Sequence, residues 1–267
     1  MSYGELIKEL KLDGRLMAIT RVRSQEEELS DAFGCVYKLI PKVLAGETFI
    51  FSKGGCSCSG FDHNTGLRDD MPQTPGGFGI FLSRGSDQQW TPPGEKFKCD
   101  PETAEAMWDC LPKEVMGDRD ALKFEPYREG MEPDIVVAFC NPDQLSALIV
   151  LHGYDKPEYE RVIATTLSGC ASMVRIPLSE LGRDKPRAVI TGTDLAARKF
   201  VDEGELAFAV TGPEFDKMLA VTEECFFHSP VWKPVRNRLR KDEHLEDPKF
   251  TILSGGSGRG RHADDDR

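Results

Sequence analysis

The spacing of hydrophobic positions changes several times along the first fifty residues, and each change predicts a new element. Apolar side chains recur at helical spacing over residues 3–12, alternate as in a strand over residues 16–22, and return to an apolar helical segment over residues 35–45. Pro41 lies inside that last segment, so we expect a helix that is bent or split there, because proline lacks the amide donor. A short strand is expected over residues 47–52.

The second half of the chain alternates more regularly between strand-like and helix-like segments. The run over residues 134–140 is almost wholly apolar, which is typical of a central strand covered on both faces. This alternation predicts an α/β fold in which a mixed sheet is flanked by helices. The expected strands span residues 121–125, 134–140, 161–166, 187–191 and 206–210, and the expected helices span residues 100–111, 141–152, 194–200, 213–226 and 231–241.

Residues 54–95 interrupt this order, because they are rich in glycine, proline, aspartate and serine. We expect a long, irregular Cys/Gly-rich loop with one strand over residues 78–82. Loops of this length inside a domain are usually functional. Residues 1–253 are expected to form a single α/β domain, and residues 254–267 lack the apolar side chains that an ordered segment needs, so a disordered tail is expected.

The composition of the chain argues against several classes of protein. The formal net charge of -11 argues against binding to nucleic acid or to an anionic membrane surface. The chain has no apolar run long enough for a membrane helix, and no secretory signal is recognisable at its start, so a cytoplasmic protein is expected. Its eight cysteines are then expected to be reduced. They are core residues, metal ligands or reactive thiols rather than disulfides.

The most informative segment is the loop Gly54-Gly55-Cys56-Ser57-Cys58-Ser59-Gly60. Glycines let the backbone turn tightly and let a bulky inorganic group approach, and Cys-X-Cys spacing can place two thiolates on one centre. Cys170 follows a predicted strand where a helix begins, and Cys35 opens a predicted helix. Both are candidate ligands: Cys170 could equally be a small buried residue, and the case for Cys35 is the weaker of the two. Cys140, Cys110 and Cys225 are predicted to be core residues, and Cys99 to be incidental.

Six segments of the chain together carry a resemblance to a known family. They are Phe33-Gly34-Cys35, Ala45-Gly46-Glu47, Cys58-Ser59-Gly60 with Gly66-Leu67, residues 132–137 with Asn141-Pro142, Gly169-Cys170-Ala171 and residues 204–210. In order and spacing they resemble the uncharacterised domain-of-unknown-function family numbered 169, which occurs in archaea and anaerobic bacteria. The resemblance spans residues 5–226 and implies an α/β domain and a role for Cys35, Cys58 and Cys170, but it brings no activity. Cys56 and a polar insertion over residues 83–98 depart from the family pattern, and the insertion could form a lid or a partner surface.

The leading hypothesis is a cytoplasmic iron–sulfur protein of anaerobic metabolism. Cys56 and/or Cys58 would bind a 4Fe-4S cluster together with Cys170 and Cys35, because four thiolates around one cluster is the common arrangement. If three bind, the open iron could act as a Lewis acid on a small-molecule substrate; otherwise the cluster could serve a redox partner protein. Whether the chain is an enzyme, and whether it forms a homo-oligomer, stays open.

Three other hypotheses remain. Zinc could bind to Cys56, Cys58, Cys170 and His63, although His63 is better interpreted as a solvent-facing loop residue. One of Cys56, Cys58 or Cys170 could instead be a metal-free nucleophile with a lowered pKa. Finally, the chain could be a small-molecule binding subunit whose cysteines are incidental. The sequence names no substrate.

Overall fold

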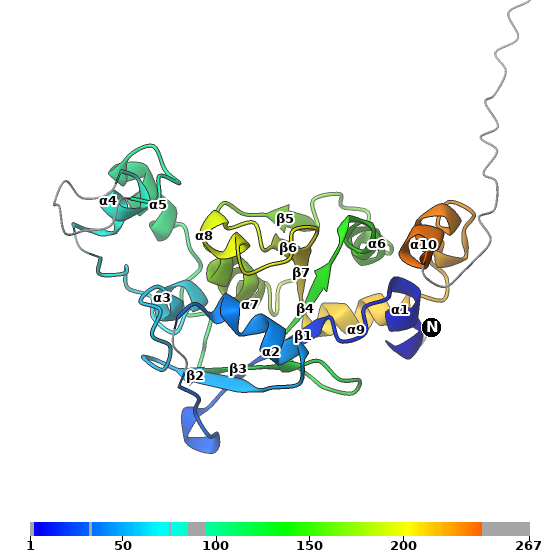
Figure 1. The fold of residues 1–267 in the computed structure, drawn as a ribbon, viewed down its shortest axis with the longest axis horizontal. Helices are drawn as coiled ribbons and strands as arrows, with labels where there is room; N and C mark the ends of the chain where they lie inside the picture. Colours follow the sequence, from blue (N-terminus) through cyan, green and yellow to red (C-terminus); the bar gives the residue numbers. More distant parts are fainter. Residues whose placement is uncertain (1–2, 32–33, 75, 85–93, 242–267) are drawn as a thin grey trace, which may run out of the picture.

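The protein is built around one mixed sheet. The structure is a computed structural model that describes residues 3–31, 34–74, 76–84 and 94–241. Within them, seven strands are ordered β2-β3-β1-β4-β7-β6-β5, with helices on both faces (Figure 1). Only β5 and β6 pair in parallel among these neighbours. The predicted α/β class is confirmed. The strands are β1 (Leu16–Val22), β2 (Phe49–Ser52), β3 (Ala121–Pro126), β4 (Ile135–Cys140), β5 (Val162–Ala164), β6 (Ala188–Thr191) and β7 (Leu206–Thr211).

Strand β4 occupies the middle of the sheet, and all six of its residues are buried, as predicted. Its side chains alternate between two cores because successive residues of a strand point to opposite faces. Val136 and Ala138 pack with α1, α6 and α9, whereas Val137 and Phe139 pack with α2 and α7. The helices are α1 (Tyr3–Leu10), α2 (Ile40–Leu44), α3 (Phe61–Thr65), α4 (Phe78–Leu82), α5 (Pro101–Asp109), α6 (Pro142–Gly153), α7 (Ile176–Ser179), α8 (Leu195–Arg198), α9 (Gly212–Ala220) and α10 (Lys233–Leu239), with shorter turns η1 (Ser24–Glu26), η2 (Val36–Lys38) and η4 (Phe226–His228) and a π-helical turn η3 (Ala171–Arg175).

The expected helix over residues 35–45 is split, as its proline predicts. Turn η2 is followed by α2, and Pro41 lies in the first turn of α2. Proline is tolerated there because the amide that it lacks has no partner within the helix at that position. Cys35 is the residue that precedes η2, and it is partly buried against the core on the α2 face of the sheet.

Two expectations for residues 54–95 are wrong. The segment is not irregular throughout, because it contains α3, and residues 78–82 form helix α4 instead of a strand. A run of five apolar residues is too short to show whether its side chains follow the period of a helix or of a strand. The element against which the run packs therefore determines its secondary structure. Here the Phe78 ring packs edge-on against Trp108 of α5, with centroids 5.3 Å apart. Residues 85–93 and the expected tail, residues 254–267, lie outside the described residues.

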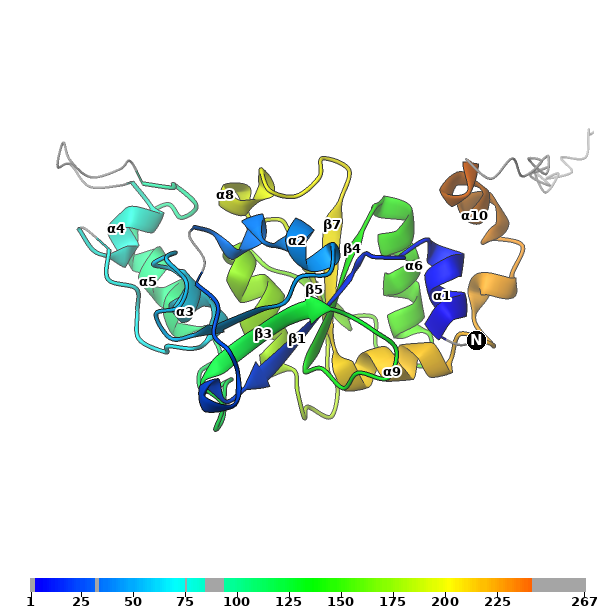
Figure 2. The ribbon, with the colours of Figure 1, turned by 60° about the horizontal axis from the view of Figure 1, so that its bottom comes forward.

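Helices α4 and α5 pack against each other and lie at one end of the molecule, whereas α1 and α10 lie at the other end (Figure 2). Among the described residues, no helix is long and apolar enough to cross a membrane. The α4–α5 pair, α3, α8 and the start of η3 supply the walls of the cavity described next.

Candidate functional site

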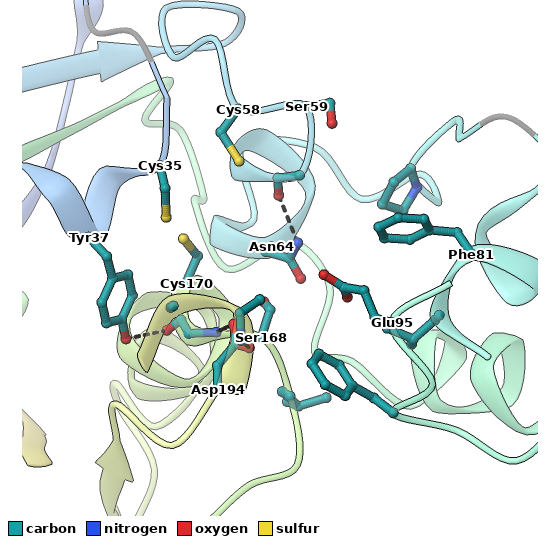
Figure 3. A pocket seen from close by; sticks show the side chains of 18 of the residues that line it. Cys35, Tyr37, Cys58, Ser59, Asn64, Phe81, Glu95, Ser168, Cys170 and Asp194 are labelled. Atoms are coloured by element: carbon teal, nitrogen blue, oxygen red, sulfur yellow. Dashed lines mark hydrogen bonds between the residues drawn. The ribbon is translucent and has the colours of Figure 1, made fainter. Parts of the chain in front are cut away.

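A cavity of about 550 Å³ lies between the α4–α5 pair and the segment that precedes η3. Its walls are mostly apolar and include aromatic rings from α4, α5 and the segment after α8. Cys35, Cys58 and Cys170 all line it, although they are far apart in the sequence. Figure 3 shows their side chains directed toward one region of the cavity from three different segments. The structure therefore brings together three of the four predicted ligands.

Cys56, the fourth predicted ligand, lies beside the cavity and does not line it. Its buried thiol donates a hydrogen bond to the Gly34 carbonyl, with 3.3 Å between Sγ and O. The Gly34 amide in turn donates to the Ser57 hydroxyl at 2.6 Å. These two bonds fasten the Cys56–Cys58 turn to the residue before Cys35, so Cys56 positions the two neighbouring cavity cysteines.

The Cys58 loop is also anchored from the other side. The Asp62 carboxylate accepts a hydrogen bond from the Gly54 amide at 2.8 Å, and Gly54 has a φ of 82°, which favours glycine. Phe61 follows the loop at the start of α3 and is fully buried against Phe51 of β2. The loop is thus held between the sheet and α3 at both of its ends.

Cys170 is placed by contacts of the preceding glycine. The Tyr37 hydroxyl donates to the Gly169 carbonyl at 3.1 Å, and the Gly169 amide donates to Asp194 at 2.7 Å. A Cβ at Gly169 would lie 2.7 Å from the Tyr37 ring, so a larger residue does not fit without a shift. Cys170 then caps the π-helical turn η3, a geometry that is frequent at functional sites.

Arg175 connects the wall that carries Cys170 to the wall that carries Cys58. Its side chain is fully buried and lies at the end of η3. It donates to the Pro112 carbonyl at 2.6 Å, to the carbonyls of His63 and Arg68, and to the Asp69 carboxylate. Sequence reasoning missed this residue, because a buried arginine carries no local signal that distinguishes it from an exposed one.

Burial raises the pKa of the Cys35 thiol, and it raises the pKa of the Cys170 thiol well above its ordinary value. The neighbouring cysteines add to both shifts, because two thiolates in one place repel each other. Both thiols are therefore protonated at neutral pH unless a cation compensates their charge. Among the described residues, no group of three or more His, Cys, Asp or Glu side chains is placed to hold a metal ion.

The remaining cysteines are divided between the core and the surface. Cys140 and Cys225 are buried, as predicted, and Cys99 is exposed. The prediction for Cys110 is wrong, because this residue is exposed where α5 ends. His63 is not a solvent-facing loop residue either. It is buried in α3, with its Nδ1 2.7 Å from the Asp70 carbonyl oxygen, and it does not line the cavity.

Glu95 is a cavity residue that the sequence did not single out. Figure 3 shows its carboxylate directed into the cavity, opposite the cysteines. Burial and, to a smaller extent, the Asp194 carboxylate raise the pKa of Glu95. Lys38 and Lys199 also line the cavity, and each ammonium lies over the Phe200 ring, at 5.4 Å and 5.2 Å from its centroid.

Comparison with known protein families identifies the family of the chain. Residues 5–221 match the family described as uncharacterised ArCR, domain of unknown function 169, so the chain belongs to this family. The resemblance seen in the sequence is thereby confirmed. No curated protein and no solved structure matches the chain.

Proposed function

We propose that this protein holds an iron–sulfur cluster on Cys35, Cys58 and Cys170 and binds a small organic molecule in the adjoining cavity. The observation that carries the proposal is the convergence of three thiols from distant segments on one region of an apolar cavity of about 550 Å³ (Figure 3). Cysteine thiolates are the usual ligands of such clusters. A cluster bound by three protein thiolates would offer its remaining iron as a Lewis acid.

The protein's own residues have separate tasks in this proposal. The three thiols must lose their protons when the cluster binds, so binding should release protons and strengthen as the pH rises. Tyr37 and Asp194 fix Gly169 and thereby the direction of Cys170. The aromatic residues Phe78 and Trp108 keep water away from the bound molecule. All eight cysteines are free, which accords with the reducing, cytoplasmic location that we also propose.

The alternatives fit this geometry less well. A zinc site would have to draw Cys56 from Gly34 and His63 from Asp70 before both could join Cys170. A metal-free nucleophile needs a lowered pKa, whereas burial raises the pKa of Cys35 and Cys170. A redox role with a partner protein uses the same three ligands, so it is a variant of the proposal.

Absorption spectroscopy of protein reconstituted under argon with iron and sulfide tests the proposal. We expect brown protein, and we expect serine at Cys35, Cys58 or Cys170 to remove most of the absorption. Cys110→Ser is the matched control, because Cys110 is exposed and outside the cavity. Cys56→Ser separates the three-thiolate from the four-thiolate site: it should keep the absorption if three thiolates suffice. Colourless wild-type protein contradicts the proposal.

A further inference from the structure

The end of the cavity opposite the cysteines combines a carboxylate with aromatic rings. Glu95, Phe81 and Phe97 all line the cavity. The Glu95 amide donates to the Phe81 carbonyl, and the Phe97 amide donates to the Leu82 carbonyl, both at 2.9 Å. These bonds hold the backbone of residues 95–97 along the end of α4, so Glu95 and Phe97 stay beside Phe81 in the chain fold.

The Glu95 carboxylate is half-buried, and within the described part of the chain it has no ion pair or side-chain hydrogen bond. Removing a carboxylate from water without a partner is unfavourable, so this group favours a bound cation or hydrogen-bond donor. The Asp194 carboxylate differs, because it accepts from the amides of Gly169 and Ala196.

Cations already lie over rings elsewhere in the cavity wall. Lys38 and Lys199 lie over Phe200, and Lys113 lies over Trp108 with its ammonium 4.9 Å from the ring centroid. Lys38 and Lys199 are exposed, so water also solvates their charge. No described cation lies over Phe81 or Phe97, so these rings and Glu95 are available to a ligand.

We propose that the molecule bound in this cavity is an organic cation, a protonated or quaternary amine with an apolar substituent, whose nitrogen lies between Glu95 and the rings of Phe81 and Phe97. This inference rests on the proposed function, since the same cavity adjoins the three thiols. A cation over an aromatic face is attracted by the ring quadrupole, and the carboxylate supplies the opposite charge. The apolar substituent then extends toward Cys35, Cys58 and Cys170.

Calorimetric titration of the metal-free protein tests this inference with three probes: benzyltrimethylammonium, benzyl alcohol and phenylacetate. We expect the ammonium to bind about tenfold more tightly than the other two. Glu95→Gln should remove that advantage while leaving benzyl alcohol unaffected, and Phe81→Leu should weaken ammonium binding more than alcohol binding. Glu102→Gln is the matched control, because Glu102 is exposed on α5 and outside the cavity.

Three outcomes overturn the inference: undetectable ammonium binding, equal binding by Glu95→Gln, or tighter binding of phenylacetate, which would indicate recognition by Lys38 and Lys199. Thermal unfolding of Glu95→Gln verifies that the variant is folded. Because the titration uses metal-free protein, its failure leaves the iron–sulfur proposal standing. Conversely, colourless protein after reconstitution would contradict the iron–sulfur proposal and leave the titration result intact.

Discussion

The Tyr37 hydroxyl donates a hydrogen bond to the Gly169 carbonyl with 3.1 Å between the oxygens. Tyr37 belongs to the turn that follows Cys35, and Gly169 immediately precedes Cys170. The bond is fully buried, and the hydroxyl also lies 3.2 Å from Thr191 Oγ1 at the end of β6. Two cavity cysteines are thus held at a set separation by one buried side chain.

Tyr37→Phe should loosen this link without removing the ring. We expect a loss of about 1 kcal/mol in the free energy of unfolding, because Gly169 keeps a hydrogen bond from Ser172. Urea denaturation measures it, with Tyr159→Phe as the control, since Tyr159 is 92% exposed. We also expect the variant to bind less iron. Wild-type stability together with wild-type iron content would show that the bond does not organise the site.

Arg175→Met should destabilise the protein far more. The carbonyls of His63, Arg68 and Pro112 would lose a common donor, and unsatisfied buried polar groups cost about 1–3 kcal/mol each. We expect a loss of about 3 kcal/mol or more by urea denaturation. Arg128→Met, at an exposed residue whose side chain makes no hydrogen bond or ion pair with the described residues, should change stability by about 0.5 kcal/mol. Similar losses in the two variants would refute the assigned role of Arg175.

Cysteine reactivity in the metal-free protein should follow exposure. Iodoacetamide at neutral pH should first label Cys99 and Cys110, which are exposed, and then Cys35 and Cys170, whose pKa values are raised by burial. Mass spectrometry of timed samples gives the order. A cavity cysteine that reacts before Cys99 would instead support metal-free thiol catalysis.

Acid should destabilise the fold through His152. This residue is fully buried near the end of α6, and burial, followed by the Lys156 ammonium, lowers its pKa to about 4. The unfolded chain binds a proton near pH 6.5, whereas the folded chain does not. The stabilisation by the neutral ring is therefore complete above about pH 6.5 and is lost as the pH falls toward 4.

Between pH 7 and pH 5, His152 should account for a loss of about 2 kcal/mol in the free energy of unfolding. His152→Leu should remove this part of the pH dependence, whereas His228→Gln, at an exposed residue, should keep it. Urea denaturation at the two pH values provides the comparison. The same pH dependence in His152→Leu and wild type would rule out this origin.

The sequence predicted the elements whose signals are local. Strand β4 is recognisable because a central strand is apolar at every position, and α6 because Asn141 caps its start and Pro142 lies in its first turn. Helix α4 was mistaken for a strand because its packing on Trp108, a tertiary contact, selects the helix. For the same reason the sequence did not show that His63 is buried, because its burial depends on α3, a helix that was not expected.

In the candidate site, too, the sequence predicted the residues that carry a local signal and missed those placed by tertiary contacts. The glycines beside Cys58 and Cys170 made these two residues candidates in the sequence, and both line the cavity. Cys56 carries the same local signal, yet its thiol contacts Gly34, because only the folded chain decides which of two adjacent thiols faces inward. Glu95 has no motif around it. Its place in the cavity follows from the backbone bond to Phe81 on α4.

Chemical analysis of iron and acid-labile sulfide in protein purified without oxygen tests the central proposal most directly. Two variants accompany the wild type: serine at all three cavity cysteines, Cys35, Cys58 and Cys170, and serine at the exposed pair, Cys99 and Cys110. We predict about four iron and four sulfide per chain in the wild type and in the exposed-pair variant, and none in the cavity variant. Wild-type protein without iron after reconstitution, or equal iron in the cavity variant, would contradict it.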